Sequence, residues 1–149
     1  MTAWVGMRAI AKAMPTDTVV ISAATGAVGI VAAALARSIG CRVVGIAGGP
    51  AKCQHAVQKL GYTVCVDYRD PNFKQLLVQA TPNGIDVDFE DVGGAIFDCV
   101  LERLNDFARI ALCGMISQYN LIEPDGLRSI GEILNKLSLI HISEPTRPY

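Results

Sequence analysis

Short apolar runs alternate with longer amphipathic or alanine-rich segments through most of the chain. The runs are nearly continuous and rich in Val and Ile, which is typical of parallel strands that are covered on both faces. The pattern predicts strands at residues 18–23, 42–47, 63–68, 86–91 and 108–114, and helices at residues 2–13, 26–39, 51–60, 72–80 and 95–104. Gly40 and Gly61 lie just past two of these helices, as C-terminal caps do. We therefore predict an α/β fold with a doubly wound parallel sheet of the Rossmann type.

The clearest chemical signal lies where the first predicted strand meets its helix. Ala24, Gly26 and Gly29 stand at the small-residue positions of a dinucleotide-binding turn, with alanine where the first glycine usually stands. Small residues let the backbone approach a pyrophosphate, and the free N–H groups at a helix start attract its negative charge. The predicted contacts of the pyrophosphate are Ala24, Gly26, Ala27, Val28 and Gly29.

Composition and charge exclude several classes of protein. The 149 residues, 51% of them hydrophobic, are enough for one domain with a core of its own. The net charge is −1 and no basic cluster is interleaved with aromatic residues, so we expect no nucleic-acid partner. No apolar stretch reaches the roughly 18 residues that span a bilayer, so we expect no membrane partner either.

The five cysteines are scattered and have no C-x-x-C spacing. They are Cys41, Cys53, Cys65, Cys99 and Cys113. We interpret them as buried, reduced thiols of a cytoplasmic protein, because disulfides are rare in that compartment. Structural zinc or disulfides are the alternative.

The two ends of the chain differ from those expected of a complete domain. Residues 137–149 have no caps and do not continue the preceding pattern, and they can be encoded by the mosaic-end adapter of transposase-based sequencing libraries. We expect residues 1–136 to be a partial dinucleotide-binding domain, truncated at both ends, and residues 137–149 to be an adapter-derived tail. An ordinary divergent C-terminus is the alternative.

Several segments of residues 1–136 resemble one family. They include Gly40-Cys41-Arg42-Val43-Val44-Gly45, Val92-Gly93-Gly94 and Cys113-Gly114-Met115-Ile116-Ser117-Gln118-Tyr119-Asn120. In them the chain resembles the nucleotide-binding domain of medium-chain dehydrogenases/reductases, in the zinc-independent branch of leukotriene B4 dehydrogenase, prostaglandin reductase, alkenal double-bond reductase and curcumin reductase. The resemblance implies that the chain is the middle of a longer enzyme, whose catalytic domain precedes it and which forms a homodimer.

The cofactor that this resemblance implies is NADP(H). The second predicted strand ends Ala47-Gly48-Gly49, without the carboxylate that binds the ribose 2′-hydroxyl of NAD. The resemblance places Lys52 on the 2′-phosphate and Tyr68 in the same pocket. The alternative is that Lys52 is a solvated helix residue and Tyr68 an aromatic residue that covers a strand end.

The resemblance further implies a loop that wraps the nicotinamide ribose after the fifth predicted strand, at the carboxyl edge where ligands of such sheets bind. The implied contacts are Cys113, Gly114, Met115, Ile116, Ser117, Gln118 and Tyr119. The alternative is a polar loop with one aromatic anchor. Asp91 stands where the family has asparagine, so a carboxylate that only accepts hydrogen bonds and adds negative charge replaces an amide. We expect it to favour the cationic, oxidised nicotinamide.

For the parent enzyme the resemblance implies hydride transfer from NADPH to the β-carbon of an α,β-unsaturated ketone or aldehyde, followed by protonation of the enolate. We find no set of zinc ligands in the sequence, and Tyr119 is the only candidate proton donor. We predict that this chain does not reduce enones by itself. The alternatives are a non-catalytic NADP(H)-binding module that senses redox state, and a fragment whose exposed sheet edge promotes aggregation.

Overall fold

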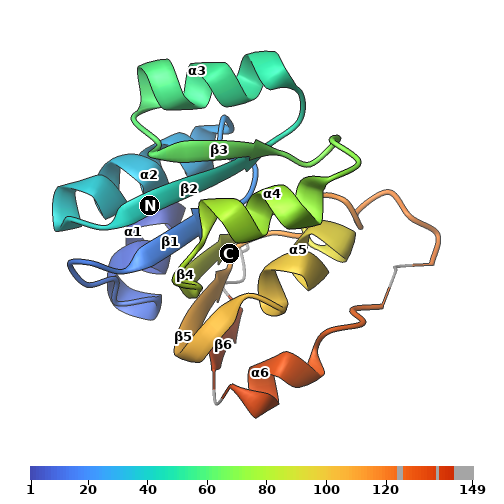
Figure 1. Cartoon of the computed structure of the whole chain (residues 1–149). Helices are drawn as coiled ribbons and strands as arrows, with labels where there is room; N and C mark the ends of the chain where they lie inside the picture. Colours follow the sequence, from blue (N-terminus) through green and yellow to red (C-terminus); the bar gives the residue numbers. More distant parts are fainter. Residues whose placement is uncertain (124–125, 137, 143–149) are drawn as a thin grey trace, which may run out of the picture.

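One parallel sheet runs through the molecule, with helices packed on both of its faces (Figure 1). The computed structural model describes residues 1–123, 126–136 and 138–142. In these residues the strands are β1 Thr18–Ile21, β2 Arg42–Ala47, β3 Val64–Asp67, β4 Ile85–Glu90, β5 Leu104–Leu112 and β6 Leu139–Ile142. The helices are α1 Thr2–Trp4, the π-helix η1 Val5–Ile10, α2 Ala27–Ile39, α3 Pro50–Leu60, α4 Phe73–Ala80, α5 Gly94–Leu101 and α6 Gly131–Asn135. The strand order β3-β2-β1-β4-β5-β6 confirms the predicted Rossmann-type sheet.

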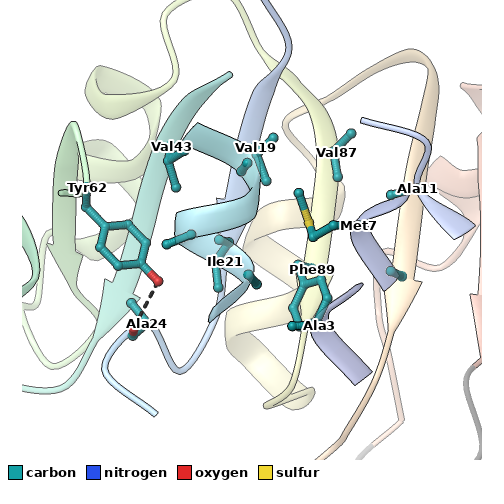
Figure 2. Packing of buried hydrophobic residues seen from close by; sticks show 14 of the residues in the cluster. Ala3, Met7, Ala11, Val19, Ile21, Ala24, Val43, Tyr62, Val87 and Phe89 are labelled. Atoms are coloured by element: carbon teal, nitrogen blue, oxygen red, sulfur yellow. Dashed lines mark hydrogen bonds between the residues drawn. The ribbon is translucent and has the colours of Figure 1, made fainter. Parts of the chain in front are cut away.

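Each face of the sheet has a separate hydrophobic core, because successive side chains of a strand point to opposite faces. Val19 and Ile21 of β1 belong to the core that η1, α2 and α3 cover, and Val20 belongs to the core that α4 and α5 cover. Figure 2 shows the first of these cores, in which Met7 of η1 lies beside Val87 and Phe89 of β4. Burial on both faces explains why the strands are continuous apolar runs in the sequence.

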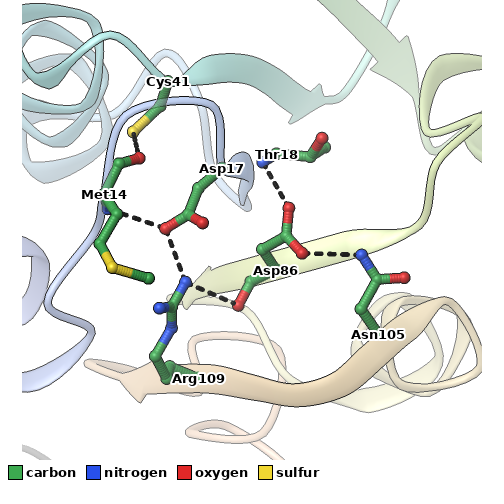
Figure 3. A network of polar contacts seen from close by, with 7 residues as sticks. All are labelled: Met14, Asp17, Thr18, Cys41, Asp86, Asn105 and Arg109. Atoms are coloured by element: carbon green, nitrogen blue, oxygen red, sulfur yellow. Dashed lines mark hydrogen bonds and ion pairs between the residues drawn. The ribbon is translucent and has the colours of Figure 1, made fainter.

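A polar network closes the amino ends of the central strands (Figure 3). The Arg109 guanidinium of β5 lies 2.6 Å from the Asp17 carboxylate, just before β1. The Asp86 carboxylate of β4 accepts hydrogen bonds from the Thr18 backbone N–H at 2.8 Å and from the Asn105 side chain at 2.7 Å. These contacts fix β1, β4 and β5 at the edge of the sheet opposite to the carboxyl ends of the strands.

Several predicted boundaries are wrong. The helix predicted at 95–104 ends at Leu101, and β5 begins at Leu104 rather than at 108. The Ile85 N–H donates to the carbonyl oxygen of Arg103 at 3.0 Å, and the Arg103 guanidinium donates to the carbonyl oxygen of Thr81 at 2.5 Å, so this segment is held in pairing with β4. The helix predicted at 2–13 ends at Ile10 as a π-helix.

The strand β6 and the helix α6 are not predicted by the sequence pattern. β6 pairs in parallel with Arg109–Leu112 of β5. It lies within the segment that we interpret as an adapter-derived tail, of which residues 137 and 143–149 lie outside the described residues. The short run Leu139-Ile140-His141-Ile142 takes a place at the free edge of β5, where its backbone completes the ladder of hydrogen bonds. The adapter origin of the tail stays a prediction.

Candidate functional site

A pocket of about 300 Å³ opens at the carboxyl ends of β1, β2 and β4. From β1 the chain order runs to β2 and β3 on one side and to β4 and β5 on the other. This is the topological switch point at which ligands of open α/β sheets bind. The pocket is lined by Ala23, Thr25, Gly26, Ile46, Ala47, Gly48, Lys52, Tyr68, Val92, Ile96 and Ile116.

The turn between β1 and α2 forms one wall of the pocket. Gly26 precedes the first residue of α2, and no side chain caps that helix start. A Cβ atom on Gly29 would lie 2.6 Å from the carbonyl oxygen of Ala23, so glycine is required for α2 to pack this closely on the turn. The backbone N–H groups at the helix start are therefore left for an anionic ligand.

The predicted pyrophosphate contacts take different positions in this turn. Gly26 lines the pocket, and Ala27 at the start of α2 is exposed. Val28 is half-buried and packs against the core, and Ala24 and Gly29 are buried. Among the described residues, Gly26 alone of these five lines the pocket.

Tyr62 is hydrogen-bonded to the turn between β1 and α2. Nothing in the sequence predicted a role for it. Its buried hydroxyl donates to the carbonyl oxygen of Ala24 at 2.9 Å (Figure 2). It also lies 3.0 Å from the carbonyl oxygen of Gly29, so the two acceptors share one proton. Burial raises the pKa of Tyr62 far above its usual value, so the hydroxyl stays a donor. The distance of more than 30 residues between donor and acceptors explains why no local pattern points to it.

The opposite wall, at the ends of β2 and β3, carries the basic side chains. Lys52 is exposed in the first turn of α3, and the ring of Tyr68 lies against Gly48, where a Cβ atom would come within 2.9 Å of it. The Arg69 guanidinium lies 5.9 Å from the centre of the Tyr68 ring, within cation–π range. Sequence analysis missed Arg69, although it follows Tyr68 directly.

Asp67 directly precedes Tyr68 of this wall, and its carboxylate accepts hydrogen bonds from backbone N–H groups. Its Oδ1 accepts hydrogen bonds from Gly49 at 2.8 Å and from Arg69 at 2.9 Å, and these bonds lower the pKa of the carboxyl group. Gly49 has a φ of +98°, which a residue with a side chain rarely adopts. Asp67 thus fixes the turn that leads into α3 and Lys52.

The loop predicted to surround the nicotinamide follows β5 and is bonded to the end of β4. The N–H groups of Cys113 and Gly114 donate to the carbonyl oxygen of Glu90 at 2.8 and 3.1 Å, and the Ile116 N–H donates to that of Asp91 at 3.0 Å. Ile116 lines the pocket. The Ser117 hydroxyl donates to the carbonyl oxygen of Val92 at 2.6 Å.

Two other side chains of this loop, Tyr119 and Gln118, make hydrogen bonds to residues of the loop itself. The Tyr119 side chain is 68% exposed, and its hydroxyl oxygen accepts a hydrogen bond from the Met115 N–H at 3.0 Å. Gln118 is buried, with its side-chain amide 2.9 Å from the Ser117 hydroxyl. Tyr119 therefore braces the loop through its hydroxyl oxygen.

The carboxyl end of β4 carries a group of acidic residues. The Oε1 atom of the fully buried Glu90 accepts hydrogen bonds from the Ser22 hydroxyl at 2.9 Å, the Val92 N–H at 2.5 Å and the Gly93 N–H at 2.7 Å. Burial raises the pKa of Glu90 above its usual value, although these bonds oppose the shift. Glu90 therefore holds the turn that leads into α5, where Gly93 has a φ of +76°.

Asp88 and Asp91 lie on either side of Glu90 in the sequence. Asp88 is fully buried, and neither oxygen of its carboxyl group has a hydrogen-bond partner among the described residues. Burial raises the pKa of Asp88 well above its usual value and that of Asp91 to about 6. The charge of Asp91, which directly precedes the lining residue Val92, therefore changes around pH 6, and the sequence did not predict this.

Within the described residues, no group of three or more His, Cys, Asp and Glu side chains is placed to hold a metal ion. Of the helices in that part of the chain, none is long and apolar enough to cross a membrane.

Three features together define a domain of the Rossmann class. They are the strand order of the sheet, the small-residue turn after β1 and the pocket at the topological switch point. The chain belongs to the zinc-binding dehydrogenase family, whose model matches residues 27–143. It is 46% identical over 126 residues to the NADPH-dependent curcumin reductase of Escherichia coli, across 84% of this chain and 36% of that protein. It is 38% identical over 137 residues to a 2-alkenal reductase (NADP(+)-dependent) of Nicotiana tabacum, across 91% of this chain and 40% of that protein.

Solved structures agree with these sequence relatives. The crystal structure of CurA in complex with NADPH from Vibrio vulnificus matches with a TM-score of 0.91 and 42% identity, across 96% of this chain and 44% of that chain. The resemblance inferred from the sequence is thereby confirmed at the level of family and branch. The chain spans 36% and 40% of the length of the two curated relatives.

Proposed function

We propose that the chain is the NADP(H)-binding domain of a reductase that acts on the C=C bond of α,β-unsaturated ketones and aldehydes. The observation that carries the proposal is the chemistry of the β2–β3 wall. Lys52 lines the pocket there with Gly48, and no carboxylate is among the described lining residues. A 2′-phosphate would meet a cation at this wall, whereas the 2′-hydroxyl of NAD would lack its usual acidic acceptor.

The other parts of the site fit the rest of the cofactor. The start of α2 at Gly26 would hold the pyrophosphate through backbone N–H groups. The loop 113–119 would hold the nicotinamide end, because it is the part of the carboxyl edge on the far side of β1 from Lys52. When bound, NADPH supplies a hydride for the β-carbon of the substrate.

The proposed roles of this chain's residues are to bind and orient. Glu90, Ser22 and the N–H groups that they bond hold the loops in place before any ligand arrives. Tyr119 is the candidate proton donor, through the hydroxyl that its contact with Met115 positions. The names of the relatives support enones and enals as the substrates. We also propose that the longer enzyme to which this domain belongs is a homodimer.

Binding of NADPH and NADH to the full chain, measured by calorimetry, tests the proposal. We expect NADPH to bind more tightly, and Lys52→Ala to weaken NADPH binding selectively. A hydrogen bond to a charged group contributes about 1.5–3 kcal/mol, which corresponds to roughly 10- to 150-fold in affinity. Lys59→Ala is the matched control, because Lys59 is exposed on the same helix and does not line the pocket.

Equal affinity for the two nucleotides, or the same loss with Lys59→Ala, would contradict the proposed cofactor. The alternative, a module that senses redox state without catalysis, predicts the same binding. An enone assay of the full-length gene product separates the two, because only the reductase consumes NADPH in the presence of substrate.

A further inference from the structure

Tyr62 connects the hydrophobic core to the turn that forms one wall of the cofactor pocket (Figure 2). It lies between α3 and β3 and is 3% exposed. Its ring packs over Gly45 of β2, where a Cβ atom would come within 2.9 Å of both the ring and the Ala24 side chain. Glycine at this place therefore leaves room for both groups. In this position the Tyr62 hydroxyl reaches the carbonyl oxygens of Ala24 and Gly29, at 2.9 and 3.0 Å.

The turn that Tyr62 contacts contains a residue in an unfavourable backbone conformation. Ala23 has a φ of +48°, in the left-handed region that residues with a side chain rarely adopt. Such a conformation persists only where the surrounding contacts hold it in place. The Tyr62 hydroxyl supplies two of these contacts, because Ala24 follows Ala23 directly and Gly29 lies in the first turn of α2. Ala23 itself lines the pocket, so the contacts of Tyr62 hold a part of the pocket wall.

The hydrogen bond to Ala24 also determines which way the next backbone N–H points. The carbonyl oxygen of Ala24 and the N–H of Thr25 belong to one peptide unit, and in a planar trans peptide these two groups point in opposite directions. Because the carbonyl is directed at the buried hydroxyl of Tyr62, the Thr25 N–H is directed away from the core. Thr25 lines the pocket, and no acceptor for its N–H lies among the residues that the structure describes.

We propose that Tyr62 is a positioning residue of the cofactor site, whose hydroxyl holds the Ala24–Thr25 peptide so that the Thr25 N–H donates to the pyrophosphate of the cofactor. The proposal rests on the proposed function, because it assigns a pyrophosphate to this pocket. Tyr62 acts from the buried side of the turn and is not among the described residues that line the pocket. The pyrophosphate is common to NADPH and NADH, so Tyr62 affects both nucleotides equally, whereas Lys52 affects NADPH alone.

Calorimetry with NADPH and NADH on Tyr62→Phe tests the effect on binding. The change keeps the ring, and with it the packing over Gly45, and removes only the hydroxyl. We expect both dissociation constants to rise by the same factor, roughly 3- to 10-fold, which is within the range that one hydrogen bond contributes. The ratio of the two constants should stay as it is in the unaltered chain.

Thr81→Val is the matched control for a merely structural role of the hydroxyl. Thr81 is also fully buried, its hydroxyl also donates to a backbone carbonyl oxygen, that of Leu77 at 2.7 Å, and it does not line the cofactor pocket. We expect it to lower the free energy of unfolding in urea about as much as Tyr62→Phe does, and to leave both dissociation constants unchanged. Equal losses of affinity in the two variants, or a changed ratio in Tyr62→Phe, would overturn the proposal.

The backbone amide resonance of Thr25 tests the orientation of the peptide without any ligand. In protein that carries isotopically labelled threonine, this resonance is assigned by its disappearance in Thr25→Ser. We expect Tyr62→Phe to shift it and Thr81→Val to leave it in place, and an unmoved resonance in Tyr62→Phe would overturn the proposal. If the unaltered chain binds neither nucleotide, the proposed function fails together with the pyrophosphate contact. The Thr25 resonance then still decides whether Tyr62 sets the orientation of the peptide.

Discussion

Asp67 and Glu90 perform the same structural task on opposite sides of the pocket, yet their pKa values shift in opposite directions. Each is the last residue of its strand and accepts hydrogen bonds from two backbone N–H groups, one of them the N–H of a glycine with positive φ. At the rim, the hydrogen bonds to Asp67 lower its pKa. In the interior, burial raises the pKa of Glu90 despite three hydrogen bonds.

The difference teaches that solvation, rather than the number of hydrogen bonds, sets how each side of the site responds to pH. A lowered pKa means that the contribution of Asp67 is complete above its unfolded pKa and is lost as pH falls. A raised pKa reverses the sign for Glu90, because above its ordinary value of 4.5 the unfolded chain releases the proton more readily than the folded one. The β4 side therefore loses stability as pH rises and the β3 side as pH falls.

Of the substitutions on the two sides, we expect Glu90→Ala to lower the free energy of unfolding the most. This change leaves the Val92 and Gly93 N–H groups and the Ser22 hydroxyl without their acceptor. Because each unsatisfied buried group costs about 1–3 kcal/mol, we expect the free energy of unfolding to fall by about 3 kcal/mol or more. Urea denaturation at pH 7 measures it.

Two further variants make this measurement specific. Asp67→Ala removes the equivalent carboxylate on the other side, and we expect a smaller loss because water can replace it at the rim. Glu90→Gln keeps an acceptor oxygen and should retain most of the stability that Glu90→Ala loses. Equal losses for Glu90→Ala and Asp67→Ala would show that burial does not separate the two sides.

The second prediction concerns Asp88, which lies opposite Val20 of β1 in the sheet. Its buried carboxyl group lacks hydrogen-bond partners among the described residues, and its pKa is raised well above 3.8. We expect Asp88→Val to stabilise the fold by about 2 kcal/mol at pH 7, since an unpaired buried polar group costs about 1–3 kcal/mol. Thermal or urea unfolding measures the gain.

The pH dependence of that gain is its sharpest check. At pH 4 the unfolded chain also holds much of the proton, so the gain from Asp88→Val should be smaller there than at pH 7. Asp106→Val is the control, because the Asp106 side chain is 74% exposed and the change should have little effect at either pH. A destabilised Asp88→Val would mean that the carboxyl group has a partner in solution.

The two sides also differ in how far the sequence predicts them. Apolar periodicity placed β1, β2, β3 and α2 to α4 close to where they lie, because β1 and β2 are buried on both faces and the other elements each contribute side chains to a core. It missed β6, where Leu139 is 71% exposed and backbone pairing rather than side-chain burial forms the strand. Edge strands of this kind leave little hydrophobic signal.

For the site, the small-residue motif led to Gly26 and the family resemblance to Lys52, Tyr68 and Ile116, and these four residues line one pocket. Their contacts with a cofactor stay a prediction. The residues that hold the pocket in shape were not predicted, because their bonds join distant parts of the chain. The hydrogen bond from Ser22 to Glu90, for example, spans 68 positions. The residue type at one position shows neither which residue its side chain will contact nor how deeply it will be buried. These two properties decide the role of an acidic residue such as Glu90 or Asp67.

Asp91→Asn has the smallest expected effect. It tests whether the acidic residue that follows β4 changes the relative affinity for NADP⁺ and NADPH. Burial raises the pKa of Asp91 to about 6, with Asp88 and Glu90 as its acidic neighbours on β4. Above pH 6 its carboxylate should favour the cationic nicotinamide of NADP⁺ over the neutral one of NADPH, by on the order of 1 kcal/mol for charges about 4 Å apart. Calorimetric titrations at pH 5 and pH 8 give the ratio of the two dissociation constants, in which the ionisation of the shared 2′-phosphate cancels. We expect this ratio to move towards NADP⁺ with rising pH in the unaltered chain and to stay constant in Asp91→Asn. A ratio that moves equally in both proteins would assign the dependence to another group and leave Asp91 without influence on the cofactor.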